Sequence, residues 1–317
     1  MKILVTGALG AIGVNLIPAL RNAGHTVVGS DVRITDFSDY VRSDITSFEE
    51  MYRIFQETKP DTIIHMAGEV GRMMGEKYPQ KMIYVNDCGT LNIIKLCMDY
   101  KTTFVNFSTS EVYGHLYDKG EEIMEEDLEL RQTAFGTTNV YALSKLFGEA
   151  LVKHYVENYG LKAVTIRPCM VYGPGEVPAK NRSAISNFIH EAMTGKQIIV
   201  HKETVRAWCY ISDFIEGVRL AMTHASDKRY EAFNVGSDEY VTAEGLAEVV
   251  LDVCGGKKSQ IKLVNPPKKF LSPVKRTSIK KLQKIGYELK VPLRQGVKLV
   301  ADWQREMGFA EKDWELQ

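Results

Sequence analysis

The sequence predicts an α/β protein built on a doubly wound parallel sheet, with a smaller C-terminal α+β lobe. Runs rich in β-forming residues alternate with helix-length segments through the first half of the 317 residues, which is typical of parallel strands joined by helical crossovers. After Arg167 the alternation becomes irregular, because prolines and glycines crowd the region up to Pro178. The strands of the sheet are expected at Ile3–Val5, Thr26–Gly29, Thr62–His65, Phe104–Phe107 and Ala163–Ile166.

Composition narrows the class of protein. Hydrophobic residues make up 44% and charged residues 25% of the chain, close to the average of soluble globular proteins. The 40 Lys and Arg balance the 40 Asp and Glu, so neither nucleic acid nor a membrane is expected as a partner. The five cysteines form no Cys-x-x-Cys pair and are odd in number. This argues against a disulfide framework and a metal site, and it favours the cytoplasm.

The first expected strand leads into a glycine loop, Thr6-Gly7-Ala8-Leu9-Gly10-Ala11-Ile12-Gly13, and then into a helical stretch. Glycines are needed where a pyrophosphate approaches the N–H groups of a helix N-terminus, because a Cβ would block the approach. The uncharged stretch Ile3–Leu20 is broken by glycines and by Pro18, which argues against a targeting or membrane segment. The residues expected to bind a dinucleotide are Gly7, Gly10, Ala11, Ile12 and Gly13.

An acidic residue follows the next expected strand. Asp31 lies 24 residues beyond Gly7, directly after Thr26–Ser30. A carboxylate there accepts both hydroxyls of an adenosine ribose and repels a 2′-phosphate, which favours NAD over NADP. Arg33 leaves the NADP alternative open, because a guanidinium is able to pair with that phosphate.

Tyr141 and Lys145 are the candidate catalytic pair, since a helix would place residues four apart on one face. The ordinary pKa of tyrosine, about 10, is too high for a base at neutral pH. An ammonium about 4 Å away, at an effective dielectric of 20, would stabilise the phenolate by about 4 kcal/mol, or about three pKa units. The positive ring of an oxidised nicotinamide would act in the same direction. Without the glycine loop upstream, a surface Tyr–Lys pair would be the simpler interpretation.

A second cluster of polar groups follows Phe104–Phe107, where the strand ends in Ser108, Thr109, Ser110 and Glu111. Open α/β sheets bind ligands at the carboxyl ends of their strands, so these groups are expected in the site. A Ser/Thr-rich turn is the alternative interpretation.

Charge is distributed unevenly along the chain. Residues 111–129 hold eight acidic residues against one Lys, whereas residues 257–298 hold thirteen Lys and Arg against one Glu. We favour solvated faces that meet opposite charge on a neighbouring segment. The alternative is an anion site, for which Arg276 is the candidate.

Over essentially the whole chain, these motifs resemble the extended short-chain dehydrogenase/reductases that modify nucleotide sugars, the NAD-dependent epimerase/dehydratase family. The matching motifs occur in the family's order: Thr6-Gly7-x-x-Gly10-x-x-Gly13, Asp31, Asp44-Ile45, Ile64-His65-Met66-Ala67-Gly68, Asn86 with Gly89-Thr90-x-Asn92, Ser108 to Gly114, Tyr141-x-x-x-Lys145, Arg167-Pro168, Val171 to Gly175, Asn187-Phe188, Arg206 with Tyr210-Ile211-x-Asp213, and Asn234-Val235-Gly236. The resemblance implies a Rossmann domain for NAD in residues 1–170, to which segments around 205–236 return. Residues 171–317 would form mainly a substrate-binding lobe.

The resemblance also implies roles for individual residues. Cofactor contacts are expected from Asp44 and Ile45 beside the adenine, from Met66, Ala67 and Gly68 along the diphosphate, and from Asn86, Ser108, Tyr141 and Lys145. Substrate contacts are expected from Thr109 and Tyr141 at the sugar 4-hydroxyl, and from Glu111, Asn187, Arg206 and Arg276. The two arginines would meet the diphosphate of a nucleotide sugar.

The family chemistry begins when Tyr141 removes the 4-hydroxyl proton while C4 gives a hydride to NAD, leaving a 4-keto sugar with an acidic C5 proton. Dehydratases and uronic-acid decarboxylases of the family carry Thr-(Asp or Ser)-Glu, so Ser110 and Glu111 favour these reactions. A 4-epimerase is the alternative enzyme. A non-catalytic NAD-binding regulator or scaffold is the alternative of another class, but binding alone would not require Thr109, Tyr141 and Lys145 together.

Several features qualify the expected substrate side. Met170 stands where the family usually has Asn, and Ser110 stands where many 4,6-dehydratases place an acidic Asp. The segment His201–Arg206 replaces the family's Gly-x-Gly-x-Gln-x-Arg. His65 and Cys169 are expected to pack rather than to react. The helices expected at 84–100 and 141–158 form the dimer interface in many relatives, so a homodimer is expected by resemblance.

Overall fold

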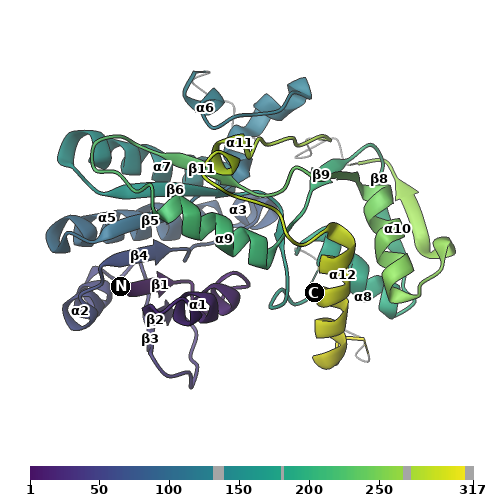
Figure 1. Cartoon of the computed structure of the whole chain (residues 1–317), viewed down its shortest axis with the longest axis horizontal. Coiled ribbons are helices and arrows are strands. Elements are labelled where there is room, and N and C mark those ends of the chain that lie inside the picture. The colour runs from purple at the N-terminus through teal and green to yellow at the C-terminus, as the bar shows by residue number, and fades with distance from the viewer. Residues whose placement is uncertain (131–138, 180–181, 267–272, 311–317) are drawn as a thin grey trace.

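The structure, a computed structural model, describes residues 1–130, 139–179, 182–266 and 273–310. Its centre is a seven-stranded sheet in the order β11-β6-β5-β4-β1-β2-β3, with every neighbouring pair parallel. Helices cover both faces of this sheet (Figure 1). The doubly wound α/β fold is therefore confirmed. The strands are β1 (Lys2–Thr6), β2 (Thr26–Asp31), β3 (Tyr40–Arg42), β4 (Thr62–His65), β5 (Thr103–Phe107), β6 (Ala163–Pro168) and β11 (Ala232–Val235).

Alternation along the strands explains the two helical layers. Leu4, Ile63 and Phe104 point to one face, where they pack with the helices α2 (Phe48–Thr58), α5 (Gly89–Tyr100) and α7 (Val140–Tyr159). Their neighbours Ile3, Ile64 and Val105 point to the other face, toward α1 (Gly13–Asn22) and α9 (Ile211–Met222). Because side chains alternate with a period of two, each strand supplies both layers of the core.

Local caps set the helix ends. Ser47 accepts a hydrogen bond from Glu50 N at 3.3 Å before α2, and Asn139 accepts one from Ala142 N at 2.9 Å before α7. The single helix expected over 84–100 is instead continuous with a longer, irregular segment. It consists of α3 (Arg72–Lys77), α4 (Pro79–Ile83), the wide π-helical turn η1 (Tyr84–Cys88) and α5. The π turn brings two consecutive polar residues, Asn86 and Asp87, into the interior.

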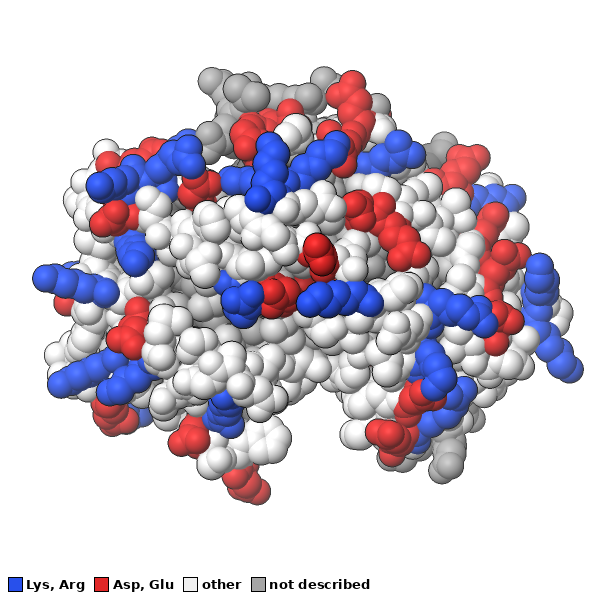
Figure 2. Space-filling model, in the orientation of Figure 1, with Lys and Arg blue, Asp and Glu red and all other residues white. Residues whose placement is uncertain are grey.

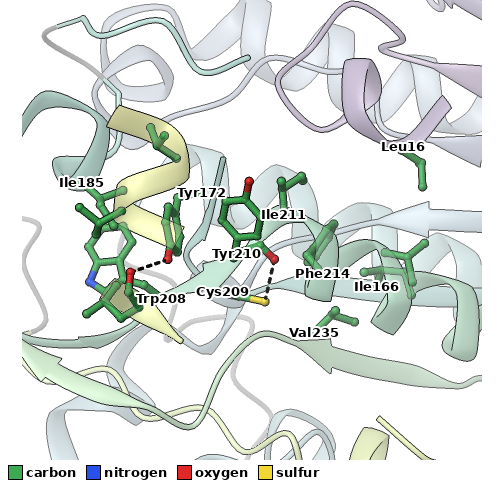
Figure 3. Close-up of a cluster of buried hydrophobic side chains, with 14 of the residues drawn as sticks. Leu16, Ile166, Tyr172, Ile185, Trp208, Cys209, Tyr210, Ile211, Phe214 and Val235 are labelled. Carbon is green, nitrogen blue, oxygen red and sulfur yellow. Dashed lines mark hydrogen bonds between the residues drawn. The ribbon is translucent and has the colours of Figure 1, made fainter. Parts of the chain in front are cut away.

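The second lobe contains α8 (Ala184–Met193), α10 (Ala243–Cys254) and α12 (Leu293–Glu306) around the parallel pair β8 (Ile198–His201) and β13 (Ile261–Val264). Two further pairs connect it to the sheet: β7 (Val171–Tyr172) with β10 (Cys209–Tyr210), and β9 (Val205–Ala207) with β12 (Tyr240–Thr242). Figure 3 shows side chains from both lobes in one cluster, from Leu16 and Ile166 to Tyr172, Trp208 and Ile185. The lobes therefore share a continuous hydrophobic core.

The acidic and basic segments lie beside each other. Lys280 Nζ is 2.6 Å from Glu122 Oε2, and Lys275 forms an ion pair with Glu111. The backbone joins them as well, since Ile123 N donates to Arg276 O at 3.0 Å. On the face seen in Figure 2, charges of both signs are interspersed. Across the described ranges, no helix has the length and apolar character needed to span a membrane.

Candidate active site

The glycine loop between β1 and α1 is shaped by missing side chains. Gly7 has a φ of 72°, and a Cβ there would lie 2.8 Å from Ala67 N. A Cβ on Gly13 would lie 2.4 Å from Ala8 O and 2.5 Å from Gly7 O. Gly10 N donates to Gly7 O at 3.0 Å, which tightens the turn that carries Gly10 and Ala11. Because no side chain caps α1 at Ile12, the first N–H groups of the helix suit phosphate oxygens.

Asp31 ends β2 beside this loop. Its Oδ2 accepts a hydrogen bond from Leu9 N at 3.1 Å, so the carboxylate braces the loop. Its Oδ1 accepts bonds from Arg33 N and Arg33 Nε, both at 3.2 Å. Arg33, on which the NADP alternative depended, is thus paired with the acid that favours NAD.

The loop after β4 faces the glycine loop. Ala67 N donates to Thr6 Oγ1 at 3.3 Å, and a Cβ on Gly68 would lie 2.7 Å from Asn86 Oδ1. Asn86 is buried and uses its amide within the protein: Oδ1 accepts from Glu69 N at 2.8 Å and Nδ2 donates to Ser144 Oγ at 2.9 Å. Asn86 therefore ties the loop that carries Met66, Ala67 and Gly68 to α7.

Asp44 and Ile45, the predicted adenine contacts, follow β3. Asp44 is exposed, and its Oδ1 accepts hydrogen bonds from Thr46 N at 2.9 Å and Thr46 Oγ1 at 2.8 Å. Ile45 is buried against Gly89, where an added Cβ would lie 2.5 Å from Ile45 Cδ1. These contacts hold the turn at the sheet edge next to Asp31.

Tyr141 and Thr109 meet beyond the end of β5. The two side chains are hydrogen-bonded, and Thr109 Oγ1 also accepts a bond from Glu111 N at 3.2 Å. Thr109 thereby links Tyr141 to the segment that carries Ser110 and Glu111. Burial raises the pKa of Tyr141 to about 12, the Thr109 hydrogen bond lowers it, and the charge of Glu111 raises it further.

Lys145 lies next to the loop after β4. Its Nζ donates to Phe107 O at 2.9 Å, and a Cβ on Gly68 would come within 3.5 Å of the same nitrogen. Burial lowers its pKa to about 8, against the opposing effect of Asp87 and Glu149. In this arrangement the Lys145 ammonium donates to a backbone carbonyl. The sequence analysis predicted that Lys145 lowers the pKa of Tyr141, but here Lys145 does not contribute to that pKa.

Glu111 sits among basic groups. Burial alone would raise its pKa, but Lys275, Arg72 and Arg206 together hold the pKa below its usual value. Lys275 forms the direct ion pair, and its own pKa is lowered, mainly by burial. Arg206 donates from Nη1 to Pro273 O and Val205 O, both at 2.7 Å. Glu111 is consequently a carboxylate at neutral pH in a site with excess positive charge.

This geometry has counterparts in known proteins. Residues 3–236 match the model of the NAD dependent epimerase/dehydratase family. The chain belongs to this family. Over 98% of its length it is 28% identical to UDP-glucuronic acid decarboxylase 6 of Arabidopsis thaliana, of which the match covers 91%.

Further relatives of this epimerase/dehydratase catalyse different reactions. It is 27% identical to the dTDP-glucose 4,6-dehydratase of Salmonella typhimurium, over 74% of this chain and 72% of that enzyme. The crystal structure of UDP-glucose 4-epimerase from Thermus thermophilus, complexed with NAD, is similar with a TM-score of 0.84 at 26% identity. That similarity covers 96% of this chain and 99% of the other.

NAD is the cofactor that this epimerase/dehydratase is arranged to bind. The glycine cradle would be filled by any Cβ at Gly7 or Gly13. Ser108 adds a second indication at the far end of the site, since its buried Oγ has no hydrogen-bond partner among the described residues. Asp31, Ser108 and the loop through Gly68 thus offer polar atoms along one sheet edge, as a dinucleotide requires.

The basic residue paired with Glu111 is Lys275, which the sequence analysis did not single out. Lys275 and Thr277 point inward, whereas Arg276 is exposed with its guanidinium 5.8 Å from the centroid of the Tyr240 ring. The isolated bridges Val205↔Val274 and Ile123↔Thr277 hold this segment in an extended conformation. Adjacent residues of an extended segment face opposite sides, so only one of the two neighbouring basic residues reaches Glu111.

Other expected substrate residues are engaged within the protein. The amide of Asn187 bonds the backbone of Ala179 in both directions, at 3.0 and 2.9 Å. Ser110 is buried beside Cys169, whose pKa burial raises to about 12, so that Cys169 is an unreactive thiol at neutral pH. Ser110, Cys169 and Lys275 line a cavity of about 10 Å³, which has room for about one water molecule.

His65 is a structural residue. It is buried, its Nδ1 lies 2.9 Å from Thr6 Oγ1, and its Nε2 lies 3.4 Å from Thr90 Oγ1. Burial lowers its pKa to about 3, and the charge of Lys145 acts in the same direction. The ring is therefore neutral at any pH at which the protein would work.

Proposed function

We propose that this protein oxidises C4 of a nucleotide-diphosphate sugar with NAD and then completes a dehydration or a decarboxylation. The observation that carries the proposal is the connected set Tyr141, Thr109 and Glu111: a hydroxyl pair joined through one hydrogen bond to the backbone of a charged carboxylate. Binding of NAD alone uses the glycine loop and Asp31, and would not call for this set.

The protein's own residues divide the work. When bound, NAD accepts the hydrogen that leaves C4 as a hydride. Tyr141 takes the hydroxyl proton, and Thr109 orients both the phenol and the sugar oxygen. Because the pKa of Tyr141 is about 12 in the present arrangement, proton removal depends on added positive charge. Lys145 supplies it when its flexible side chain leaves Phe107 O for the cofactor ribose and Tyr141.

Glu111 acts in the second step. In a dehydratase it would remove the C5 proton beside the 4-ketone, and in a decarboxylase it would place or protonate the intermediate left by carbon dioxide. Its lowered pKa keeps it ionised and able to accept a proton. Lys275, paired with it, is positioned to return a proton or to hold a developing negative charge. Arg206 remains our candidate for the substrate diphosphate, with Arg276 and Asn187 as more distant contributors.

A 4-epimerase is the second candidate, because the similarity to the Thermus thermophilus 4-epimerase extends over 96% of this chain. Hydride return to the other face of the ketosugar needs Tyr141, Thr109 and Lys145 but no second base. Glu111 is the residue that separates the two reactions.

The test is incubation of the protein with UDP-, dTDP- and GDP-linked sugars and uronic acids in D2O, with products identified by NMR. Deuterium at C5 or C6, or loss of C6 as carbon dioxide, supports the proposal. Glu111→Gln keeps the size of the side chain and loses its basicity, so this variant should form NADH on adding substrate but stall before product. If it yields wild-type product at full rate and no deuterium enters the wild-type product, the protein is a 4-epimerase. Tight NAD binding without turnover of any sugar would indicate a non-catalytic protein.

We also propose a cytoplasmic homodimer whose interface includes α5 and α7. Leu143 and Phe147 lie four residues apart on α7 with 44% and 48% exposure, and Leu91 on α5 is 36% exposed. Large apolar side chains at helical spacing favour a partner surface. All five cysteines are free thiols, as suits a reducing compartment. Analytical ultracentrifugation tests the assembly: a species of twice the chain mass supports it, and a monomer at micromolar concentration contradicts it.

A further inference from the structure

A buried carboxyl group next to Lys145 has no role in the chemistry described so far. Asp87 lies on the π-helical turn η1, is 8% exposed, and its Oδ1 has no hydrogen-bond partner among the described residues. An orphaned acidic oxygen in the interior is costly, because burial removes its water without a replacement. A nearby positive charge would offset this cost by stabilising the ionised carboxylate.

The backbone fixes Asp87 close to Lys145. Asn86, the preceding residue on η1, donates to Ser144 Oγ at 2.9 Å, and Ser144 precedes Lys145 on α7. Each member of the pair is thus one residue away from a hydrogen bond that joins η1 to α7. The two charges act on each other, since Lys145 favours the ionised form of Asp87 and Asp87 favours the ionised form of Lys145.

The other charged groups around Lys145 are already engaged. Glu149, one turn along α7, accepts two hydrogen bonds from Arg167 at 2.9 and 2.7 Å. Glu69, on the loop after β4, is paired with Lys81 at 2.6 Å. His65, on β4, is neutral, and Tyr141 on α7 and Glu111 on η2 (Ser110–Lys119) belong to the sugar side. Within the described ranges, Asp87 is the carboxylate near Lys145 that has an oxygen to spare.

We propose that Asp87 is a positioning residue that keeps the Lys145 ammonium charged at neutral pH. The inference rests on the proposed function, in which a charged Lys145 assists Tyr141. Burial lowers the pKa of Lys145 to about 8 and raises that of Asp87 to about 7. Between these values both groups are charged and attract each other, and above about pH 8 the lysine becomes neutral. Loss of the Asp87 charge would move that transition to lower pH.

The experiment follows Lys145 directly, without substrate or NAD. Protein labelled with ¹³C at lysine Cε is titrated by NMR, and the Lys145 resonance is identified by its absence in Lys145→Met. In the wild type it should titrate near pH 8. In Asp87→Asn, which keeps the shape and removes the charge, the midpoint should fall by about one unit. Asp99→Asn, which removes an exposed acid from α5, is the matched control and should leave the midpoint unchanged.

The melting temperature of Asp87→Asn distinguishes a positioning role of Asp87 from a purely structural one. Because the pKa of Asp87 is higher in the folded than in the unfolded chain, its carboxyl destabilises the fold increasingly as pH rises from about 4 to about 7. Asp87→Asn should therefore melt above the wild type at pH 8, where a merely disruptive substitution would melt below it, while the alkaline limb of NADH formation moves to lower pH. Asp87→Ala gives the same test if the asparagine variant folds poorly.

Two results would overturn the inference: an unchanged Lys145 midpoint in both Asp87 variants, or an equal shift in Asp99→Asn. A shifted midpoint in a protein that turns over no nucleotide sugar would leave the Asp87–Lys145 pairing standing and reject the proposed function instead.

Discussion

The predicted cofactor side of the active site is formed mainly by backbone, whereas the predicted substrate side, around Glu111, is formed by long charged side chains. On the cofactor side, Gly7 takes a positive φ and the loop closes within 3 Å of where its side chain would be. On the substrate side, positive φ values occur at Met170 and Glu203, and the surface is formed by Glu111, Arg206 and Lys275. The glycine loop tolerates almost no substitution, because an added side chain would clash with backbone atoms. The charged side chains around Glu111 can be substituted one at a time without changing the backbone.

This difference explains why related proteins share a cofactor and differ in the reaction. A phosphate cradle has one workable backbone shape. A sugar pocket of side chains from several segments changes with each side chain, and its selectivity changes with it. The four predictions below test this contrast, from the largest expected effect to the smallest.

Tyr141→Phe, where the two sides meet, should reduce C4 oxidation by about 10² to 10⁴-fold, because it removes the base and leaves the glycine loop intact. NAD affinity, measured by calorimetry, should stay within about twofold of the wild type, since no phosphate contact is lost. Near-normal NADH formation in single-turnover mixing with a substrate would show that the Tyr141–Lys145 pair is only a feature of the helix surface.

Gly13→Ala should weaken NAD binding by about 10- to 100-fold, because forcing an extra carbon into a packed loop costs about 1–3 kcal/mol. The new Cβ would meet two backbone oxygens, at 2.4 and 2.5 Å, which are unable to move aside as a side chain would. Gly24→Ala is the control: Gly24 has a positive φ of 85°, but the space around its Cβ is open. It should lower the melting temperature and leave NAD affinity as it was, and equal NAD affinities in the two variants would contradict the cradle.

Lys275→Met and Arg276→Met compare two neighbours on the substrate side. Lys275→Met leaves Glu111 without its ion-pair partner and should cost about 1–3 kcal/mol of unfolding free energy. Arg276→Met removes an exposed cation–π contact worth about 0.5–1 kcal/mol. The pKa of Glu111 should rise only in the first variant, so the acid limb of its pH–rate profile should move to higher pH. If the two variants have the same pH–rate profile, the Lys275–Glu111 ion pair lies outside the active site.

Glu203→Asn should stabilise the substrate lobe by about 0.5 kcal/mol, because asparagine adopts the left-handed region more readily than glutamate. Glu203 is exposed and has a φ of 59°. Lys202→Asn, at the neighbouring exposed position with no positive φ, should not stabilise. Denaturant unfolding midpoints compare the two, and equal midpoints would show that the turn carries no strain.

The sequence predicts the cofactor side well because its signals are local. A strand, three glycines and a terminal acid lie within about thirty residues, and each has one physical meaning. The five expected strands all occur, and Tyr141, in the first turn of α7, meets Thr109, which follows the end of β5.

The substrate side depends on register between distant segments, which no local pattern records. Lys275 and Arg276 are equivalent as sequence, and only the bridges to Ile123 and Val205 decide which one faces Glu111. The orphaned Asp87 is hidden for a similar reason, since a regular helix was expected where a π turn carries it inward. Met170 differs from the family pattern at a position where φ is 48°, a conformation that asparagine tolerates and methionine rarely adopts.

The late strand β11, which joins the sheet beside β6, affects how the chain folds while it is being synthesised. β6 pairs with β5 on one side and with β11 on the other. Residues 169–231, 63 in number, lie between β6 and β11, and a ribosome adds about 5–20 residues per second, so the β6 edge stays uncovered for several seconds. Five of its six residues are buried in the folded protein, and an open edge of this kind recruits other strands. A nascent chain stalled before Val235 should therefore be bound by chaperones, whereas one released after it should fold unaided.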